Sequence, residues 1–143
     1  MSYSRILVPI DFSELSERAL EQAAAMAKTL GASLTLLHVH ERVIVPTVDP
    51  AFRPPDALDD PGDLAESLTH GLQRLADKLD FDDERIDVRV EIGDPIDEIL
   101  AVCKDHDLAV LATHGRRGVG QFLLGSVTER TVRKADCSVL VVR

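Results

Sequence analysis

Short apolar runs separated by amphipathic stretches predict a sheet covered by helices. Residues 5–10, 33–39 and 108–112 are mostly apolar runs of strand length, which is typical of parallel strands buried on both faces. Residues 86–92 instead alternate apolar and charged side chains, which favours a half-exposed strand at an edge of the sheet. Residues 138–142 form one more apolar run, so the pattern predicts five strands.

Apolar residues at helical spacing fill the intervals between these strands. The first helix is expected to begin after Ser13, a good N-cap, and to stop at Gly31, which suits the position after a helix end. A second helix is expected from about residue 63 to residue 79, with its leucines on one stripe. Asp94-Pro95 is a helix start, an N-cap followed by proline at the first helical position, and the last helix is expected over residues 125–135.

Strand, helix and strand in succession form a βαβ unit with a right-handed crossover. The predicted fold is therefore α/β: a Rossmann-like, doubly wound, five-stranded parallel sheet of order 3-2-1-4-5 with helices on both faces, in one domain over residues 1–143. Residues 41–63 interrupt the pattern, because they are rich in proline and have no period. We interpret them as a mobile loop, with residues 43–45 packing near the ligand site.

Composition narrows the class of protein and of partner. The 143 residues are 45% hydrophobic and only 3% aromatic, so we expect an aliphatic core. The net charge of -9 argues against nucleic acid or an anionic membrane as a partner. We find no apolar run of the roughly 20 residues that span a membrane and no signal peptide, so we expect a cytoplasmic protein. Cys103 and Cys137 have no metal-like spacing, and we expect both to be packing thiols.

Residues 108–128 combine the parts of a phosphate-binding segment. The apolar run ends at Thr113-His114-Gly115 and is followed by a loop with further glycines at 118 and 120. The pattern Ser126-Val127-Thr128-Glu129 then has the form of a capping box that opens a helix. Glycines let backbone N–H groups approach an anion, and the start of a helix adds unpaired donors. The segment therefore predicts phosphate binding.

Gly115, nine intervening residues and then Gly125-Ser126 resemble the nucleotide loop of the universal stress protein family, in its ATP-binding branch. The family pattern is Gly-x2-Gly-x9-Gly-Ser/Thr, and this chain departs from it at the first position, Ala112. The resemblance also covers the segments 6–13, 37–39 and 138–142, and so nearly the whole chain outside residues 41–63.

The predicted topology, without any appeal to the family, brings two segments together. Asp11 follows the strand at residues 5–10, and His114-Gly115 follows the strand at residues 108–112. In the order 3-2-1-4-5 these two strands are neighbours at the switch point, where the strand order reverses. The resemblance implies that Asp11 binds adenine or ribose hydroxyls, that the backbone of Val39 contacts adenine, and that Val127 donates an N–H group to phosphate. It implies a nucleotide site made of Pro9, Asp11, Val39, Ala112, Gly115, Gly125, Ser126 and Val127.

Each of these residues also has a structural interpretation. Asp11 and Ser126 are good helix caps, the two glycines suit turns, and Val39 suits a core. Ala112 adds a Cβ near the ribose, so we expect weakened binding. Arg116 and Arg117 are candidate phosphate ligands, although loop arginines are often simply solvated, and His114 favours a turn or packing role over catalysis.

Three functions remain open. The first is a nucleotide-binding regulatory protein that holds ATP with Mg²⁺ and presents it to an unknown protein partner. The second is a slow ATPase, which is disfavoured because no Walker A sequence, general base or catalytic lysine accompanies the loop. The third is an adaptor module without nucleotide. In each case we expect a homodimer through the C-terminal strand, because residues 139–142 are apolar on both faces and belong at a sheet edge.

Overall fold

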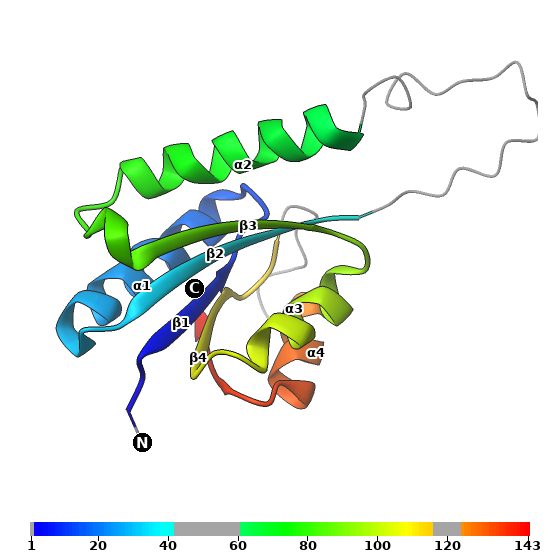
Figure 1. Cartoon of the computed structure of the whole chain (residues 1–143). Helices are drawn as coiled ribbons and strands as arrows, with labels where there is room; N and C mark the ends of the chain where they lie inside the picture. Colours follow the sequence, from blue (N-terminus) through cyan, green and yellow to red (C-terminus); the bar gives the residue numbers. More distant parts are fainter. Residues whose placement is uncertain (1, 42–60, 116–123) are drawn as a thin grey trace, which may run out of the picture.

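The computed structural model describes residues 2–41, 61–115 and 124–143. These residues form a five-stranded parallel sheet of order β3-β2-β1-β4-β5, which confirms the predicted order. Figure 1 shows the strands running side by side between two layers of helices. The strands are β1 (Arg5–Pro9), β2 (Ser33–His40), β3 (Ile86–Ile92), β4 (Leu108–Ala112) and β5 (Ser138–Val142).

The helices lie on both faces of the sheet, as a doubly wound fold requires: α1 and α2 cover one face, and α3 and α4 cover the other (Figure 1). Within the described residues they are α1 (Glu14–Leu30), α2 (Pro61–Asp77), α3 (Pro95–Cys103) and α4 (Ser126–Lys134), with a short 3-10 turn η2 (Asp83–Arg85). None of these helices has both the length and the apolar character needed to cross a bilayer.

Helix α2 begins earlier than the sequence pattern indicates. It starts at Pro61, so residues 61–63, which we assigned to a mobile loop, belong to a helix. Proline suits this place, because the first turn of a helix does not need its missing N–H group. The rest of the predicted loop, residues 42–60 with the segment 43–45, lies outside the described residues.

Helix α1 has the predicted ends. The Ser13 hydroxyl accepts a hydrogen bond from the Ser16 N–H group at 3.2 Å, and Gly31 closes the helix with a left-handed φ of 69°. A run of alanines that includes Ala19, Ala23 and Ala27, all fully buried, faces the sheet. Their small side chains let the helix approach the strands closely.

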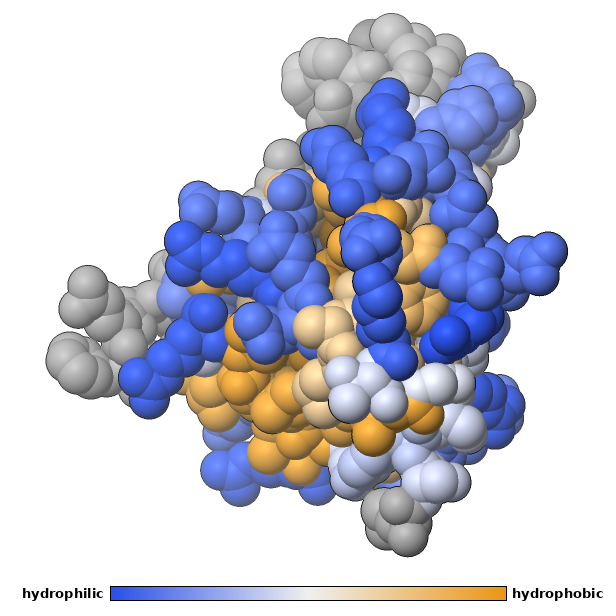
Figure 2. Space-filling view, turned by 90° about the vertical axis from the view of Figure 1, so that its left-hand side faces the viewer, coloured by the Kyte–Doolittle hydropathy of each residue, from blue (hydrophilic) through white to orange (hydrophobic). Residues whose placement is uncertain are grey.

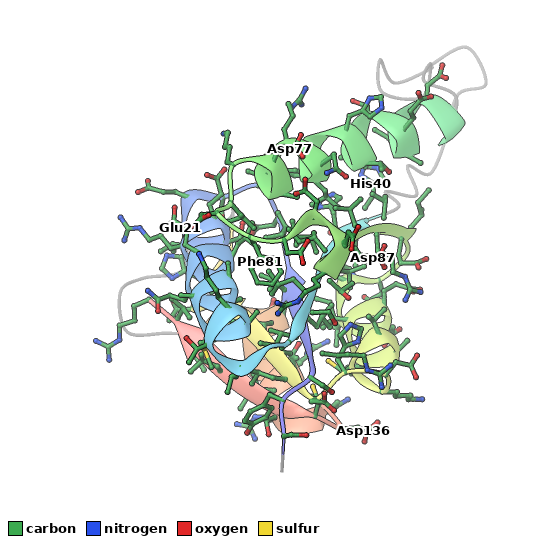
Figure 3. The ribbon with its side chains drawn as sticks, turned by 60° about the vertical axis from the view of Figure 1, so that its left-hand side comes forward. Glu21, His40, Asp77, Phe81, Asp87 and Asp136 are labelled. Carbon is green, nitrogen blue, oxygen red and sulfur yellow. The ribbon has the colours of Figure 1, made fainter. Side chains whose placement is uncertain are left out.

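Alternate side chains of the central strands supply two separate core clusters. In β1, Ile6 and Val8 pack under α1 and α2, whereas Leu7 packs under α3. Every residue of β4 is buried, while β3 and β5 are half-exposed at the two edges. The acidic side chains Glu21, Asp77 and Asp87 are exposed on the outside of this layered body (Figure 3).

The two cysteines come together in the cluster under α3. Burial, with Cys137 next to it, raises the pKa of the Cys103 thiol to about 12, and burial also raises the pKa of the Cys137 thiol. A thiol held in its protonated form is a poor nucleophile. Both cysteines are free, and they serve as packing residues here.

Asp107 ties the beginnings of the two central strands together. Its Oδ2 accepts hydrogen bonds from the Ser4 N–H and hydroxyl groups and from the Arg5 N–H group, at 2.9, 2.8 and 2.9 Å. These bonds, that of the Ser4 hydroxyl first, lower the pKa of the Asp107 carboxyl. The contact aligns β1 and β4 at their amino ends. Their carboxyl ends then lie next to each other at the opposite end of the strands.

Candidate functional site

A cavity of about 500 Å³ opens at the carboxyl ends of β1 and β4, where the strand order reverses. Ligand pockets in proteins commonly have about 300–1,000 Å³, so its size suits a small molecule. All of the residues predicted for the site line this cavity: Pro9, Asp11, Val39, Ala112, Gly115, Gly125, Ser126 and Val127. The structure thus brings them together, and their contacts with a ligand stay a prediction.

Asp11 stands at the end of β1 in a turn that leads into α1. Its Oδ1 accepts hydrogen bonds from the Ser13 N–H group at 3.0 Å and from the Ser13 hydroxyl. Ser13, in turn, is the N-cap of α1. The structural interpretation of Asp11 as the cap itself is therefore wrong, because Asp11 holds the cap and still lines the cavity.

Gly115 brings the loop after β4 against the Asp11 carboxylate. A Cβ atom built on Gly115 would lie 2.2 Å from Asp11 Oδ2, so any side chain at this position would displace the carboxylate. Glycine at position 115 therefore lets the Asp11 carboxylate keep its present place against the loop. This contact joins segments that lie far apart in the sequence, as the switch-point argument predicts.

The start of α4 forms the opposite wall of the cavity. Gly125 is its N-cap and makes no side-chain capping bond, and Ser126 is the first helical residue. The predicted capping box with Ser126 as the cap is therefore wrong. The first bond of the helix runs from the Glu129 N–H group to the Gly125 carbonyl, so the N–H groups of Ser126, Val127 and Thr128 precede the helical ladder.

Two hydrogen bonds to backbone carbonyls fix this helix start relative to β4. The Gly125 N–H group donates to the Thr113 carbonyl at 2.7 Å, and the Thr128 hydroxyl donates to the Ala112 carbonyl at 2.8 Å. A Cβ on Gly125 would lie 3.2 Å from His114 Cα, which is tighter than an ordinary contact. Gly125 therefore allows the loop and the helix start to pack together.

Helices α1, α3 and α4 all begin at the cavity, but their first turns differ. The first turn of α1 is capped by Ser13, and that of α3 is capped by Asp94, whose carboxylate accepts from the Ile96 and Asp97 N–H groups. The cap occupies one of the first N–H groups of α1 and two of those of α3, and Asp94 adds a negative charge to the start of α3. The start of α4 lacks such a cap, so among these three it is the one suited to an anion.

The floor between these walls is apolar. The side chains that line it come from β1, β2, α3 and β4, and they include Leu37, Val39, Ile96, Ile99 and Leu111. Carboxylates of Glu41 and Asp94 stand on the same lining. The cavity therefore presents an apolar surface, a carboxylate at Asp11 and the N–H groups of a helix start to a bound molecule.

Sequence reasoning did not include the start of α3 in the site. Asp94, Pro95 and Ile96 line the cavity, although we predicted only their role in starting a helix. A signal was available, because every helix that follows a strand in a parallel sheet begins at the carboxyl edge. The buried Thr128, which anchors α4 to β4, left no such signal.

Arg116, Arg117 and His114 are also candidate residues of the site. Arg116 and Arg117, the candidate phosphate ligands, lie outside the described residues, as do the glycines at 118 and 120. His114 lines the cavity, and its Nδ1 lies 3.3 Å from the Thr113 hydroxyl. In the described part of the chain, no group of three or more His, Cys, Asp or Glu side chains is arranged to hold a metal ion.

Comparisons with known proteins agree with the fold. The model of the family described as "Universal stress protein family" matches residues 2–143. A Staphylococcus aureus (strain USA300) protein that bears the name universal stress protein is 33% identical over 148 residues, covering 100% of this chain and 86% of that relative. The solved structure of the universal stress protein UspA from Lactobacillus plantarum is 27% identical with a TM-score of 0.74, covering 100% of this chain and 99% of the other.

Two further solved structures of universal stress proteins contain nucleotides. One, in complex with cAMP, is 23% identical with a TM-score of 0.71 and covers 100% of this chain and 99% of its own. The other, from Archaeoglobus fulgidus in complex with dAMP, is 18% identical with a TM-score of 0.56 and covers 100% of both chains. At these identities the likeness shows the fold alone. The family model and the Staphylococcus relative go further: this chain belongs to the universal stress protein family.

Proposed function

We propose that this protein is a nucleotide-dependent regulatory homodimer of the cytoplasm that binds ATP, accompanied by Mg²⁺, in the cavity between β1 and β4. The observation that carries the proposal is the placement of three chemically different surfaces around one cavity. The uncapped start of α4 suits phosphate, the Asp11 carboxylate suits a hydroxyl or amino donor, and the apolar floor suits a base. The complexes of two relatives with cAMP and dAMP support a nucleotide as the ligand.

The proposed contacts assign one part of the nucleotide to each wall. The N–H groups of Ser126 and Val127 and the hydroxyl of Ser126 bind phosphate oxygens, with Gly115 and Gly125 keeping the approach open. Asp11 accepts a hydrogen bond from the ribose or the adenine. Pro9, Val39 and Ala112 lie against the base and the sugar.

A magnesium ion fits this site as a companion of the phosphates and not as a resident metal. The described residues offer it no cage of three protein ligands. Mg²⁺ commonly binds through substrate phosphates, waters and one or two carboxylates. The cavity lining supplies carboxylates of this kind at Asp11, Glu41 and Asp94.

We propose a binding protein and not an enzyme. Two of the polar groups that line the described part of the cavity have structural partners: Asp11 accepts from Ser13, the cap of α1, and the Thr128 hydroxyl donates to a backbone carbonyl. Hydrolysis would need a base that orients a water molecule against the terminal phosphate. Multiple turnovers of phosphate release from ATP, lost in Gly125→Val, would contradict this part of the proposal.

The homodimer is proposed to form through β5. This strand lies at an edge of the sheet and all of its residues are half-exposed. Figure 2 shows a continuous apolar area in the lower half of one face of the molecule, on the side where β5 runs. Pairing with a second copy about a two-fold axis would satisfy the open edge and cover that area.

Thermal unfolding with and without nucleotide tests the proposal. If ATP binds with a dissociation constant near 10 μM, 1 mM ATP raises the free energy of unfolding by about 2.7 kcal/mol. ATP, ADP, AMP and cAMP are compared in parallel, since they share the base and differ in their phosphates. Gly125→Val is expected to abolish the shift and to retain the dimer. A wild-type protein whose unfolding temperature does not respond to any of the four would support the adaptor function instead.

A further inference from the structure

Phe12 has a backbone conformation that is unusual for a large side chain. Its φ is +62°, and among the described residues it is the one non-glycine residue with a positive φ. L-residues other than glycine, asparagine and aspartate rarely adopt this region, and the conformation costs free energy. Such strain persists only where the surroundings hold it in place, and it often occurs next to functional residues.

The surroundings that hold Phe12 are on the far side of the turn from the ligand cavity. Its ring packs against α2, where a Cβ atom built on Gly71 would lie 3.1 Å from Cε1 and 3.2 Å from Cζ. The ring also lies 4.8 Å from the His38 ring, centroid to centroid, and His38 Nδ1 lies 2.7 Å from the Ile10 carbonyl. Phe12 belongs to the cluster under α1 and α2 and is not part of the cavity lining.

The left-handed turn at Phe12 brings its two neighbours, Asp11 and Ser13, together. Asp11 reaches back to accept hydrogen bonds from the Ser13 N–H and hydroxyl groups, and its other oxygen lies against Gly115. The turn thus joins an anchored ring on one side to a carboxylate in the cavity on the other. A shift of the ring moves the backbone that carries Asp11.

We propose that Phe12, seated against Gly71 of α2, is the positioning residue that holds the Asp11 carboxylate in place for the nucleotide. This inference rests on the proposed function. It adds a coupling between the cavity and α2, although no described residue of α2 lines the cavity. Gly71 is the feature that permits it, because its missing side chain is the space that the ring occupies. Packing changes in α2 therefore alter nucleotide affinity through Asp11.

The central test is Gly71→Ala, with Ser67→Ala on the exposed side of the same helix as the matched control. Alanine favours a helix more than glycine does, so a loss of affinity here would not come from loss of helix stability. We expect Gly71→Ala to weaken AMP binding about threefold to tenfold, the range set by one misaligned hydrogen bond, and Ser67→Ala to leave it unchanged.

A double-mutant cycle with Asp11→Ala separates positioning from a general effect on the fold. We expect Gly71→Ala to weaken AMP binding in the wild-type background and to have no further effect once Asp11 is removed. Equal losses in both backgrounds would overturn the proposal. Phe12→Asn gives a second arm, because asparagine accepts a positive φ but lacks the ring. Full AMP affinity in Phe12→Asn would also overturn it.

A measurement without ligand keeps this proposal distinct from the proposed function. The α-proton resonances of Gly115 report on the carboxylate that contacts it. We expect them to shift in Gly71→Ala and not in Ser67→Ala, and unchanged resonances in Gly71→Ala would overturn the positioning role. A wild-type protein that binds none of the nucleotides would overturn the proposed function, and the Gly115 resonances would then decide by themselves whether Gly71 sets the position of Asp11.

Discussion

The Asp11 carboxylate occupies the space that a side chain on Gly115 would need. Oδ2 of Asp11 lies 2.2 Å from the place where a Cβ atom of residue 115 would stand. Asp11 lies in the turn after β1, and Gly115 lies in the loop after β4. The contact therefore joins the two halves of the proposed nucleotide site at the switch point of the sheet.

Gly115→Ala is expected to reduce nucleotide affinity by about as much as Asp11→Ala does, roughly 1–3 kcal/mol, because the added methyl group must displace the carboxylate. Isothermal titration with AMP measures the effect. Gly93→Ala is the control, since a Cβ there meets the side chain of Glu98, which can move away. Wild-type affinity in Gly115→Ala would show that the Asp11 carboxylate does not contact the ligand.

Ser126→Ala separates binding from capping. Gly125 is the N-cap of α4, so loss of the Ser126 hydroxyl is expected to change the free energy of unfolding by less than about 0.5 kcal/mol. The same change at Ser13, which caps α1, is expected to cost about 1 kcal/mol.

Nucleotide binding gives the complementary result for the same variant. Ser126→Ala is expected to lower ATP affinity by about 1 kcal/mol, because one phosphate hydrogen bond is lost. Chemical denaturation and titration calorimetry on the same samples measure the two quantities. A variant that loses stability and keeps its affinity would restore the capping-box interpretation.

Val141→Lys is expected to give a folded monomer. Val141 is half-exposed in the edge strand β5, so a lysine there charges the edge without removing a buried side chain. Light scattering coupled to size-exclusion chromatography measures the mass. Asp87→Lys, on the opposite edge strand β3, is the control and is expected to leave the dimer intact. A dimer that survives Val141→Lys would place the interface elsewhere.

The lowered pKa of the Asp107 carboxyl predicts that the free energy of unfolding depends on pH. Hydrogen bonds from Ser4 and Arg5 hold the pKa of its carboxyl below the ordinary value of 3.8 in the folded state. The contribution of Asp107 is therefore fully present above that ordinary value and is lost as the pH falls through the lowered pKa. Wild type is expected to be more stable than Asp107→Asn at pH 7, with the difference shrinking in acid. Denaturation of both proteins across this pH range measures the difference, and a difference that grows in acid would contradict the assignment.

Local patterns were sufficient for the fold. The apolar run over residues 108–112 is β4, buried throughout, and the alternation over residues 86–92 is the half-exposed edge strand β3. Helix α1 begins after Ser13 and stops at Gly31, as the capping preferences of these two residues predict. The helix ends depend on a few neighbouring residues. The strand patterns depend on whether one or both faces of the strand are covered, and this leaves a periodic pattern in the sequence.

The place of the cavity could also be predicted from the sequence, because a doubly wound order of strands brings the carboxyl ends of β1 and β4 together. The convergence of Asp11 and Gly115 followed from this topology, whereas the full set of site residues came from the family resemblance. The start of α3 at the same edge followed from the same rule but was not used. The exact beginnings of helices were harder: Ser126 has the local signature of a cap, yet Gly125 is the cap.

What the amino-acid order determined by itself is the set of elements, their order in the sheet and the end of the strands at which the cavity lies. The three-dimensional packing determined how the site is held: the positive φ of Phe12, the space left by Gly71 and the contact of Asp11 with Gly115. The physical reason is range. Periodicity and capping act over a few residues, whereas these contacts join segments far apart in the chain, and their distances exist only after the helices have packed on the sheet.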